Sequence, residues 1–118
     1  MTTTPGNYQF TIYQGATFQE LLTLRDSSDA LVDLTGKSAK LQIKKTYNSD
    51  TALVTISSTT SGIYLGGVLG TVQLTISATS TASLVAGEYF YDLILINGSV
   101  VDRILEGKIK VVPSITEV

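Results

Sequence analysis

Carboxylates are the first side chains to examine for chemistry in this 118-residue chain, because the sequence contains neither histidine nor cysteine. That composition removes the commonest general base, the commonest metal ligand and any thiolate site. Asp26, Asp29 and Asp33 are spaced closely enough to offer oxygen ligands to calcium. The stretch lacks the glycine and the terminal glutamate of an EF-hand loop. We therefore interpret the three aspartates as solvated turn carboxylates and predict no metal site.

Two pairs of carboxylates four residues apart are candidates for acid–base catalysis: Glu88 with Asp92, and Asp102 with Glu106. In a strand such neighbours share a face but lie ~13 Å apart at the usual rise. Glycoside hydrolysis needs a separation of roughly 5–9.5 Å. The sequence leaves open whether carboxylates on two different strands form such a pair. We predict that these groups balance charge on a sheet surface and that the chain has no catalytic residues.

A run of glycines, Gly62, Gly66, Gly67 and Gly70, invites comparison with a phosphate-binding loop. Such a loop needs a lysine and a hydroxyl residue after its last glycine, with a helix behind them. Here Thr71 and an alternating, strand-like segment follow instead. We predict turn glycines, no cofactor-binding residues and no cofactor.

The charge pattern argues against nucleic acid as a partner. The formal net charge is −2, from 8 basic and 10 acidic residues, whereas nucleic-acid binders carry a clear positive excess. In the densest basic cluster, Lys40 and Lys44 fall on the strand face opposite Leu41 and Ile43, so we interpret that cluster as a solvated face. It also contains Lys37 and Lys45.

The sequence also predicts no membrane partner. No apolar stretch approaches the ~20 residues that span a bilayer. The N-terminal "MTTTPGN" has neither the basic nor the apolar region of a signal peptide. We therefore expect a soluble protein that is synthesised in a cytoplasm.

Period-2 alternation of apolar and polar residues dominates the chain and predicts half-buried strands. It predicts no long helix; Ser77 is expected to cap one short helical turn that ends near Leu84. The inward face of 51–58 is ambiguous between Leu53/Thr55 and Val54/Ile56. We predict one all-β domain over 1–118, an antiparallel β-sandwich of seven to nine strands, with a flexible arm at 1–7 and a short tail at 114–118. The strand-like segments are 8–13, 17–24, 39–45, 51–58, 63–65, 72–76, 89–96 and 105–111.

The stretch "YFYDLILINGSVVDRILEGKIKV", 89–111, predicts a long hairpin. Asn97 and Gly98 suit a two-residue type I′ turn, since both can take positive φ. Apolar residues on both faces of 89–96 favour a central strand covered on two sides. The predicted register places Asp92 directly opposite Arg103, which would satisfy a carboxylate in a largely buried strand.

Six motifs follow one another over about residues 8–113: "YQGATF", "DLTG", "LQIKK", "GIYLGGVLGTVQLTIS", "LVAGEYFYDLIL" and "RILEGKIKVVP". Their order resembles that in a group of small phage and prophage virion proteins. The matching positions are Gln14–Gly15, Asp33–Gly36, Gly66–Gly67, Ala86–Asp92 and Leu105–Gly107. The resemblance implies an immunoglobulin-like sandwich, similar to the N-terminal domain of upper-baseplate proteins in some lactococcal phages.

That resemblance implies a non-enzymatic structural protein of a phage particle, made in the cytoplasm of a bacterial host. The chain ends at Val118 without a fibre stalk. We therefore expect a separate tail or baseplate component, a fibre adaptor or a capsid cement protein. Its partners would be other virion proteins and further copies of itself, with the exposed Leu21 as one apolar contact.

The sequence leaves a second class of function open. A carbohydrate- or receptor-binding module needs exposed aromatic platforms, and Tyr47 and Tyr64, which fall in expected turns, are the candidates. An enzyme would have to rely on carboxylates or a Ser–Lys pair, for which the sequence gives no signal.

Overall fold

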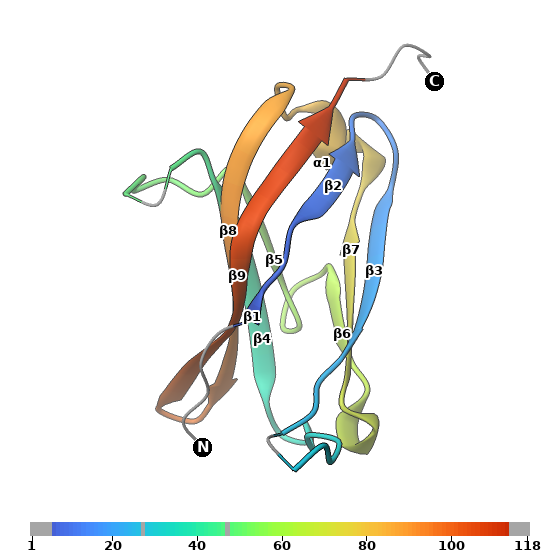
Figure 1. The fold of residues 1–118 in the computed structure, drawn as a ribbon, viewed down its shortest axis with the longest axis vertical. Coiled ribbons are helices and arrows are strands. Elements are labelled where there is room, and N and C mark those ends of the chain that lie inside the picture. The colour runs from blue at the N-terminus through green and yellow to red at the C-terminus, as the bar shows by residue number, and fades with distance from the viewer. Residues whose placement is uncertain (1–5, 27, 47, 114–118) are drawn as a thin grey trace.

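The protein is an all-β sandwich of two sheets, as a computed structural model shows for residues 6–26, 28–46 and 48–113 (Figure 1). One short helix and one 3-10 turn join strands of the smaller sheet to their neighbours. The elements are β1 (Gly6–Asn7), β2 (Phe10–Tyr13), β3 (Phe18–Thr23), β4 (Ser38–Lys44), β5 (Val54–Ser57), β6 (Ile63–Leu65), η1 (Gly67–Leu69), β7 (Thr71–Ile76), α1 (Ala78–Ala82), β8 (Gly87–Asn97) and β9 (Val100–Val112).

The strand order is that of an immunoglobulin-like fold. The larger sheet runs β1-β9-β8-β4-β5, with β2 also paired to β9, and the smaller sheet runs β3-β7-β6. Numbered from β3 as strand B, these sheets correspond to B-E-D and to G-F-C with an added C′ strand. The predicted fold class is confirmed.

Alternating side chains from both sheets fill the space between the layers. Leu41 and Ile43 of β4 face Leu93 and Tyr91 of β8 in register, and all four are buried. Leu74 and Val72 of β7, in the opposite sheet, are buried in the same core cluster. In β5 the ambiguity is resolved, because Val54 and Ile56 are buried whereas Leu53 is 50% exposed.

The larger sheet is mixed, which corrects the expectation of purely antiparallel sheets. β1 and β2 both run parallel to β9, with Phe10 opposite Ile109 and Tyr13 opposite Val112. Gly6 and Asn7, assigned above to a flexible arm, are therefore paired into the sheet. The rest of that arm and the predicted tail lie outside the described residues.

The predicted turn of the long hairpin is wrong by one position. Asn97 pairs with Val100, so Gly98 and Ser99 are the two loop residues. Gly98 has φ of +62° and Ser99 does not have positive φ, which is the pattern of a type II′ turn with glycine first. Asn-Gly pairs favour a type I′ turn, but here the turn begins at the glycine and Asn97 remains in the strand.

A β-bulge at Ile104 then shifts the register again. Leu93 lies opposite Leu105 and Ile94 opposite Arg103, so Ile104 is the extra residue. Without it, the alternation that begins at the turn would send Ile109 outward, because one extra residue exchanges the two faces of a strand. With it, Ile109 and Val111 are buried.

The prediction that β8 is central is confirmed, since β9 and β4 flank it. Its second face is less covered than expected. Phe90, Asp92, Ile94 and Ile96 are only half-buried, while the side chains that alternate with them are buried.

Hydrogen bonds lock the end of the sandwich where α1 lies. Ser77 caps α1 as predicted, accepting the Ser80 N–H at 3.2 Å. The buried Thr81 hydroxyl donates to the Ala16 carbonyl at 2.8 Å, and the Tyr89 hydroxyl donates to the Val85 carbonyl. The last bond is that of the tyrosine corner found at the start of strand F in immunoglobulin-like domains.

At the opposite end of the sandwich, three backbone atoms leave no room for a side chain at Gly70. Its φ is +67°, and a Cβ placed there would lie 3.0 Å from the Leu24 and Val32 carbonyl oxygens. Gly36 has a similar φ of +77° but open space around it. The two glycines therefore separate the cost of backbone strain from the cost of crowding.

We expect Gly70→Ala to destabilise the fold by about 2–4 kcal/mol and Gly36→Ala by about 1 kcal/mol. Both substitutions force a side chain into the left-handed region, but only the first also displaces backbone. Chemical denaturation of the two variants and the parent measures the difference. Equal losses at both positions would contradict the crowding at Gly70.

Candidate functional site

The outward face of the larger sheet carries a continuous polar row. Thr55, Gln42, Asp92 and Glu106 lie opposite one another on β5, β4, β8 and β9. Gln42 donates to the Thr55 hydroxyl at 3.4 Å. Asp92 and Glu106, two carboxylates, are thus direct cross-strand neighbours, a placement that is unfavourable without a counter-charge.

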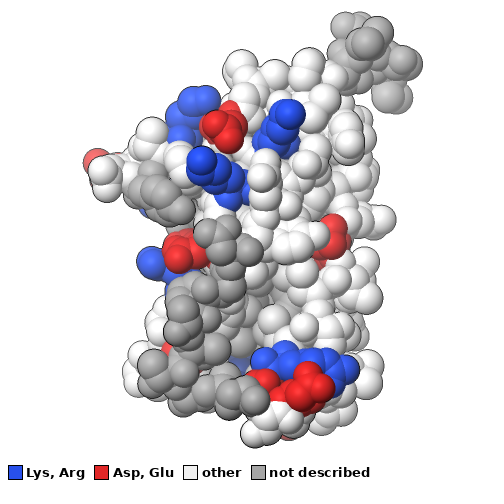
Figure 2. Space-filling view, viewed as in Figure 1, with Lys and Arg blue, Asp and Glu red and all other residues white. Residues whose placement is uncertain are grey.

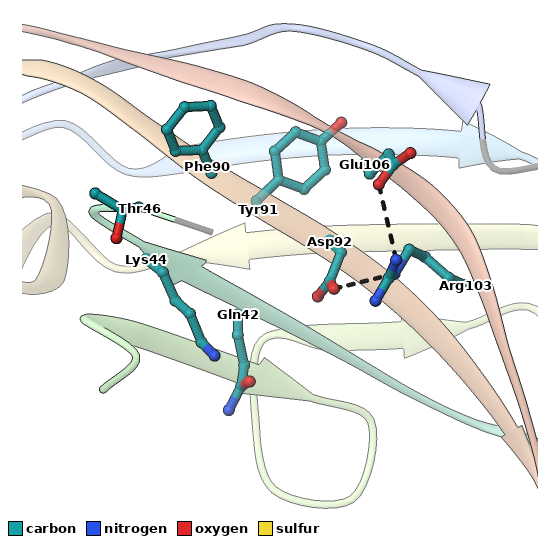
Figure 3. Close-up of a pocket in the computed structure, with 8 residues that line it drawn as sticks. All are labelled: Gln42, Lys44, Thr46, Phe90, Tyr91, Asp92, Arg103 and Glu106. Atoms are coloured by element: carbon teal, nitrogen blue, oxygen red, sulfur yellow. Dashed lines mark ion pairs between the residues drawn. The ribbon is translucent and has the colours of Figure 1, made fainter. Parts of the chain in front are cut away.

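Arg103 supplies that counter-charge from β9. Its Nε lies 3.2 Å from Asp92 Oδ2, and its Nη1 lies 3.9 Å from Glu106 Oε2 (Figure 3). The bulge at Ile104 places Glu106 on the outward face opposite Asp92, so that both carboxylates lie beside Arg103. A shallow hollow surrounds the three groups, and its lining is Gln42, Lys44, Thr46, Phe90, Tyr91, Asp92, Arg103 and Glu106.

The predicted Asp92–Arg103 contact is present, but the predicted register is wrong. Asp92 lies opposite Glu106, and Arg103 lies opposite Ile94. The shifted turn accounts for two positions of the difference and the bulge for the third. Arg103 reaches Asp92 diagonally, since long side chains span neighbouring pairs on one face.

The structure also joins one member from each of the carboxylate pairs considered for catalysis. Asp92 and Glu106 meet across strands, an arrangement that the sequence analysis left open. Their side chains are 37% and 33% exposed, and both bind Arg103, which is 55% exposed. Arg103 thus neutralises two carboxylates that solvent reaches. This arrangement is typical of a surface ion pair, which contributes about 0–1 kcal/mol, and less typical of a site for proton transfer.

The acidic loop is built as a turn. Asp26 Oδ1 accepts the Ser28 N–H at 2.9 Å and the Ala30 N–H at 3.0 Å. Asp29 adopts a positive φ of 64°, and its Oδ1 lies 4.0 Å from Arg25 Nε. Within the described residues, no three His, Cys, Asp or Glu side chains are grouped to hold a metal ion.

Asp33 organises the "DLTG" turn that follows. Its Oδ1 accepts the Thr35 N–H at 2.9 Å, and the Lys37 N–H donates to the Leu34 carbonyl at 3.0 Å. Gly36 takes the positive φ required at the third residue of a type II turn. Hydrogen bonds from the Thr35 side chain and then from its backbone lower the pKa of Asp33, with a smaller contribution from Lys37.

Three glycines of the run, Gly66, Gly67 and Gly70, form the tight turn around η1. Gly67 begins η1 and Gly70 ends it in the left-handed conformation, directly before β7. The Gly67 carbonyl accepts the Leu34 N–H at 3.0 Å, so the "DLTG" and "LGG" motifs contact one another. These motif residues shape one end of the sandwich.

The lysines follow the predicted solvated pattern. Lys40 and Lys44 point away from the buried Leu41 and Ile43. Lys45 lies over the Tyr89 ring, 4.6 Å from its centroid. No helix in the described part of the chain is long and apolar enough to cross a membrane.

Charge is distributed unevenly between the two sheets. Charged groups gather over the larger sheet and at the lower loops, while the flank formed by β3 shows one acidic group (Figure 2). On the smaller sheet, Leu21 and Tyr64 are 61% and 65% exposed. Tyr47, the other aromatic candidate, lies outside the described residues.

The uncharged face of the smaller sheet is the feature that motif reasoning missed. Leu21, Gln73 and Tyr64 form one row across β3, β7 and β6. The period-2 patterns of 18–24 and 72–76 contained the signal, because their outward positions hold no charged residue. Leu21 was identified from the sequence as an apolar contact, and Tyr64 as an exposed aromatic residue that was expected in a turn but lies in β6.

No protein-family model matches the chain, and none of the curated proteins is significantly similar to it. The class of the protein is therefore defined by its fold, an immunoglobulin-like β-sandwich.

We expect Arg103→Ala to lower the free energy of unfolding by about 1 kcal/mol at low salt, because it leaves Asp92 opposite Glu106 without a counter-charge. The loss should shrink at high salt as the repulsion is screened. Adding Asp92→Asn should restore part of the stability. Denaturant titrations at two salt concentrations measure these effects.

Arg25→Ala is the matched control, since Arg25 is the other arginine of the chain and its ion pair is longer and more exposed. Its removal should change stability little. An equal, salt-independent loss in both variants would contradict the proposed balance of charges.

We expect Asp33→Asn to be less stable than the parent near neutral pH. A lowered pKa in the fold means that the ionised carboxylate stabilises the protein above the ordinary value of 3.8, and that this stabilisation is lost as pH falls below it. The difference between parent and variant should therefore vanish in acid. Asp50→Asn, which removes the same charge from another exposed loop, is the control for thermal unfolding across pH.

Proposed function

We propose that this protein is a non-enzymatic structural component of a bacteriophage particle that acts through protein–protein interfaces. A tail, baseplate or fibre-adaptor position is the first choice, and a capsid decoration protein is the alternative. The supporting observation is the agreement between the order of the motifs over about 8–113 and the observed immunoglobulin-like sandwich, which is the fold that the resemblance implies.

The motifs support this proposal because their residues are structural. Asp33 and Gly36 build a turn, Gly67 accepts a bond from Leu34, and Tyr89 closes a corner. Motif residues that stabilise turns and strand ends are what we expect in a protein that acts by binding other proteins through its surface. The charge-poor outward face of the smaller sheet supplies a surface suited to contact with other proteins, because interface cores are depleted of charged residues.

A carbohydrate-binding module remains the second candidate, on one observation. Tyr64 is 65% exposed and lies beside Gln73, which together offer a flat aromatic ring and an amide for hydrogen bonds. Binding of the chain on a glycan array, lost in Tyr64→Ala, would favour this candidate. Absence of any glycan signal would remove it.

Incorporation into particles tests the main proposal. The chain, carrying an affinity label, is expressed in the bacterial host during phage growth, and purified particles are imaged. We expect the label at the tail or baseplate; a label on the capsid shell would select the decoration alternative. Leu93→Asp, which disrupts a fully buried position, is the control for folding-dependent incorporation. Particles without label would contradict the proposal.

A further inference from the structure

The smaller sheet ends in a long strand edge that no other described strand pairs. β3 is six residues long and has β7 on one side only. The other outermost strands of the two sheets are shorter: β1 has two residues, β2 and β5 have four each, and β6 has three. In Figure 1, β3 lies along the rim of the molecule. A regular free edge of this kind is a template for a further strand.

The hydrogen-bond pattern of the sheet shows which groups β3 presents at that edge. Thr75 lies opposite Gln19, and the Thr75 N–H donates to Gly62 on the far side of β7, at 2.7 Å. Successive residues of an antiparallel strand direct their backbone N–H and C=O groups alternately to the neighbouring strand on one side and to that on the other. The Gln19–Thr75 pair is therefore a non-bonded one. Three residues of β3 direct their N–H and C=O groups to the free edge: Gln19, Leu21 and Thr23.

The outward face beside this edge has no charge to repel a copy of itself. Leu21 is exposed at its centre, and Tyr64 ends the same row on β6. The larger sheet contrasts with it, since its outward face carries lysines and the Asp92–Arg103–Glu106 group. The outward side chains of β3 and β7 are Gln19, Leu21, Thr23, Thr71, Gln73 and Thr75.

We propose that two copies of this chain pair antiparallel through their β3 edges, about a two-fold axis at Leu21. The Leu21 residues of the two copies would exchange both backbone hydrogen bonds, and Gln19 would pair with Thr23 of the other copy. The smaller sheets then form one continuous sheet. The same surface serves both copies, as two-fold symmetry requires.

Glu20 selects this register over its neighbour. Glu20 shares the inward face of β3 with Phe18 and Leu22 and is half-buried. An axis at Glu20 would place two carboxylates directly opposite each other, which is unfavourable. An axis at Leu21 places each Glu20 opposite Leu22 of the other copy. Glu20 therefore weakens the pairing while fixing its register.

This pairing deepens the proposed assembly role and rests on it for its biological setting. Dimerisation can be measured on the full chain alone by sedimentation, at protein concentrations from about 10 µM to about 1 mM. This range covers the dissociation constants of weak but specific complexes. We expect the mass to rise from 12.6 kDa toward twice that value. A constant mass over the whole range would overturn the inference.

Leu21→Lys and Tyr64→Lys form a matched pair of variants. Both replace an exposed residue of the same row by lysine, but only Leu21 lies at the proposed axis. We expect Leu21→Lys to weaken dimerisation at least about tenfold, because it places like charges opposite each other. Tyr64→Lys should leave it unchanged, and Glu20→Gln should strengthen it. Equal effects of the two lysines would overturn the edge pairing.

Single cysteines test the register, since the chain has none of its own. At the axis, the two Leu21 α-carbons would lie about 5.5 Å apart, within the range of a disulfide. Mild oxidation should therefore cross-link Leu21→Cys. Gln19→Cys, whose copies would lie ~13 Å apart, should form no cross-link. Cross-linking of Glu20→Cys in place of Leu21→Cys would show that the register is wrong.

The two proposals fail in different ways. A chain that stays monomeric but enters phage particles would overturn the β3 pairing and leave the assembly role in place. A chain that dimerises through β3 but never enters particles would overturn the assembly role and leave the pairing in place.

Discussion

The bulge at Ile104 is the constraint on which both faces of the larger sheet depend. β9 must send Ile109 and Val111 inward and Glu106, Lys108 and Lys110 outward, and the hairpin turn alone sets the opposite phase. One extra residue corrects it. The same extra residue turns Glu106 to the outward face opposite Asp92 and beside Arg103, so a packing requirement creates the polar cluster on the surface.

The two ends of the sandwich are held by polar contacts of different kinds. At one end the hydroxyls of Thr81 and Tyr89 satisfy backbone carbonyls that strands cannot pair. At the other, Asp33 and the left-handed Gly70 shape tight turns around Leu34, which is buried. Buried or crowded backbone groups need such partners, and the motif residues are the ones that supply them.

Local patterns in the sequence predicted the strands well, because alternation records which face meets the core. The inward residues of β4, the central place of β8 and the capped α1 were predicted correctly. Pairing between strands was harder, since it depends on a turn type and a bulge that are decided by competition among several residues. Asp92 and Arg103 were matched correctly through an incorrect register, because a long side chain tolerates a diagonal contact. The parallel pairing of β2 had no local signal, and neither did the approach of Asp92 to Glu106.

The parallel pairing of β2 with β9 has a mechanical consequence. β1 and β2 run parallel to β9, so the start of β1 and the end of β9 point in opposite directions along the sheet, with backbone bonds running from Tyr8–Glu106 to Gln14–Val112. Tension applied to the segments before β1 and after β9 pulls these strands lengthwise past each other. The bonds between them then share the load and must break together, whereas a hairpin pulled at its open end unzips one bond at a time. The domain is thus built to resist stretching along its long axis.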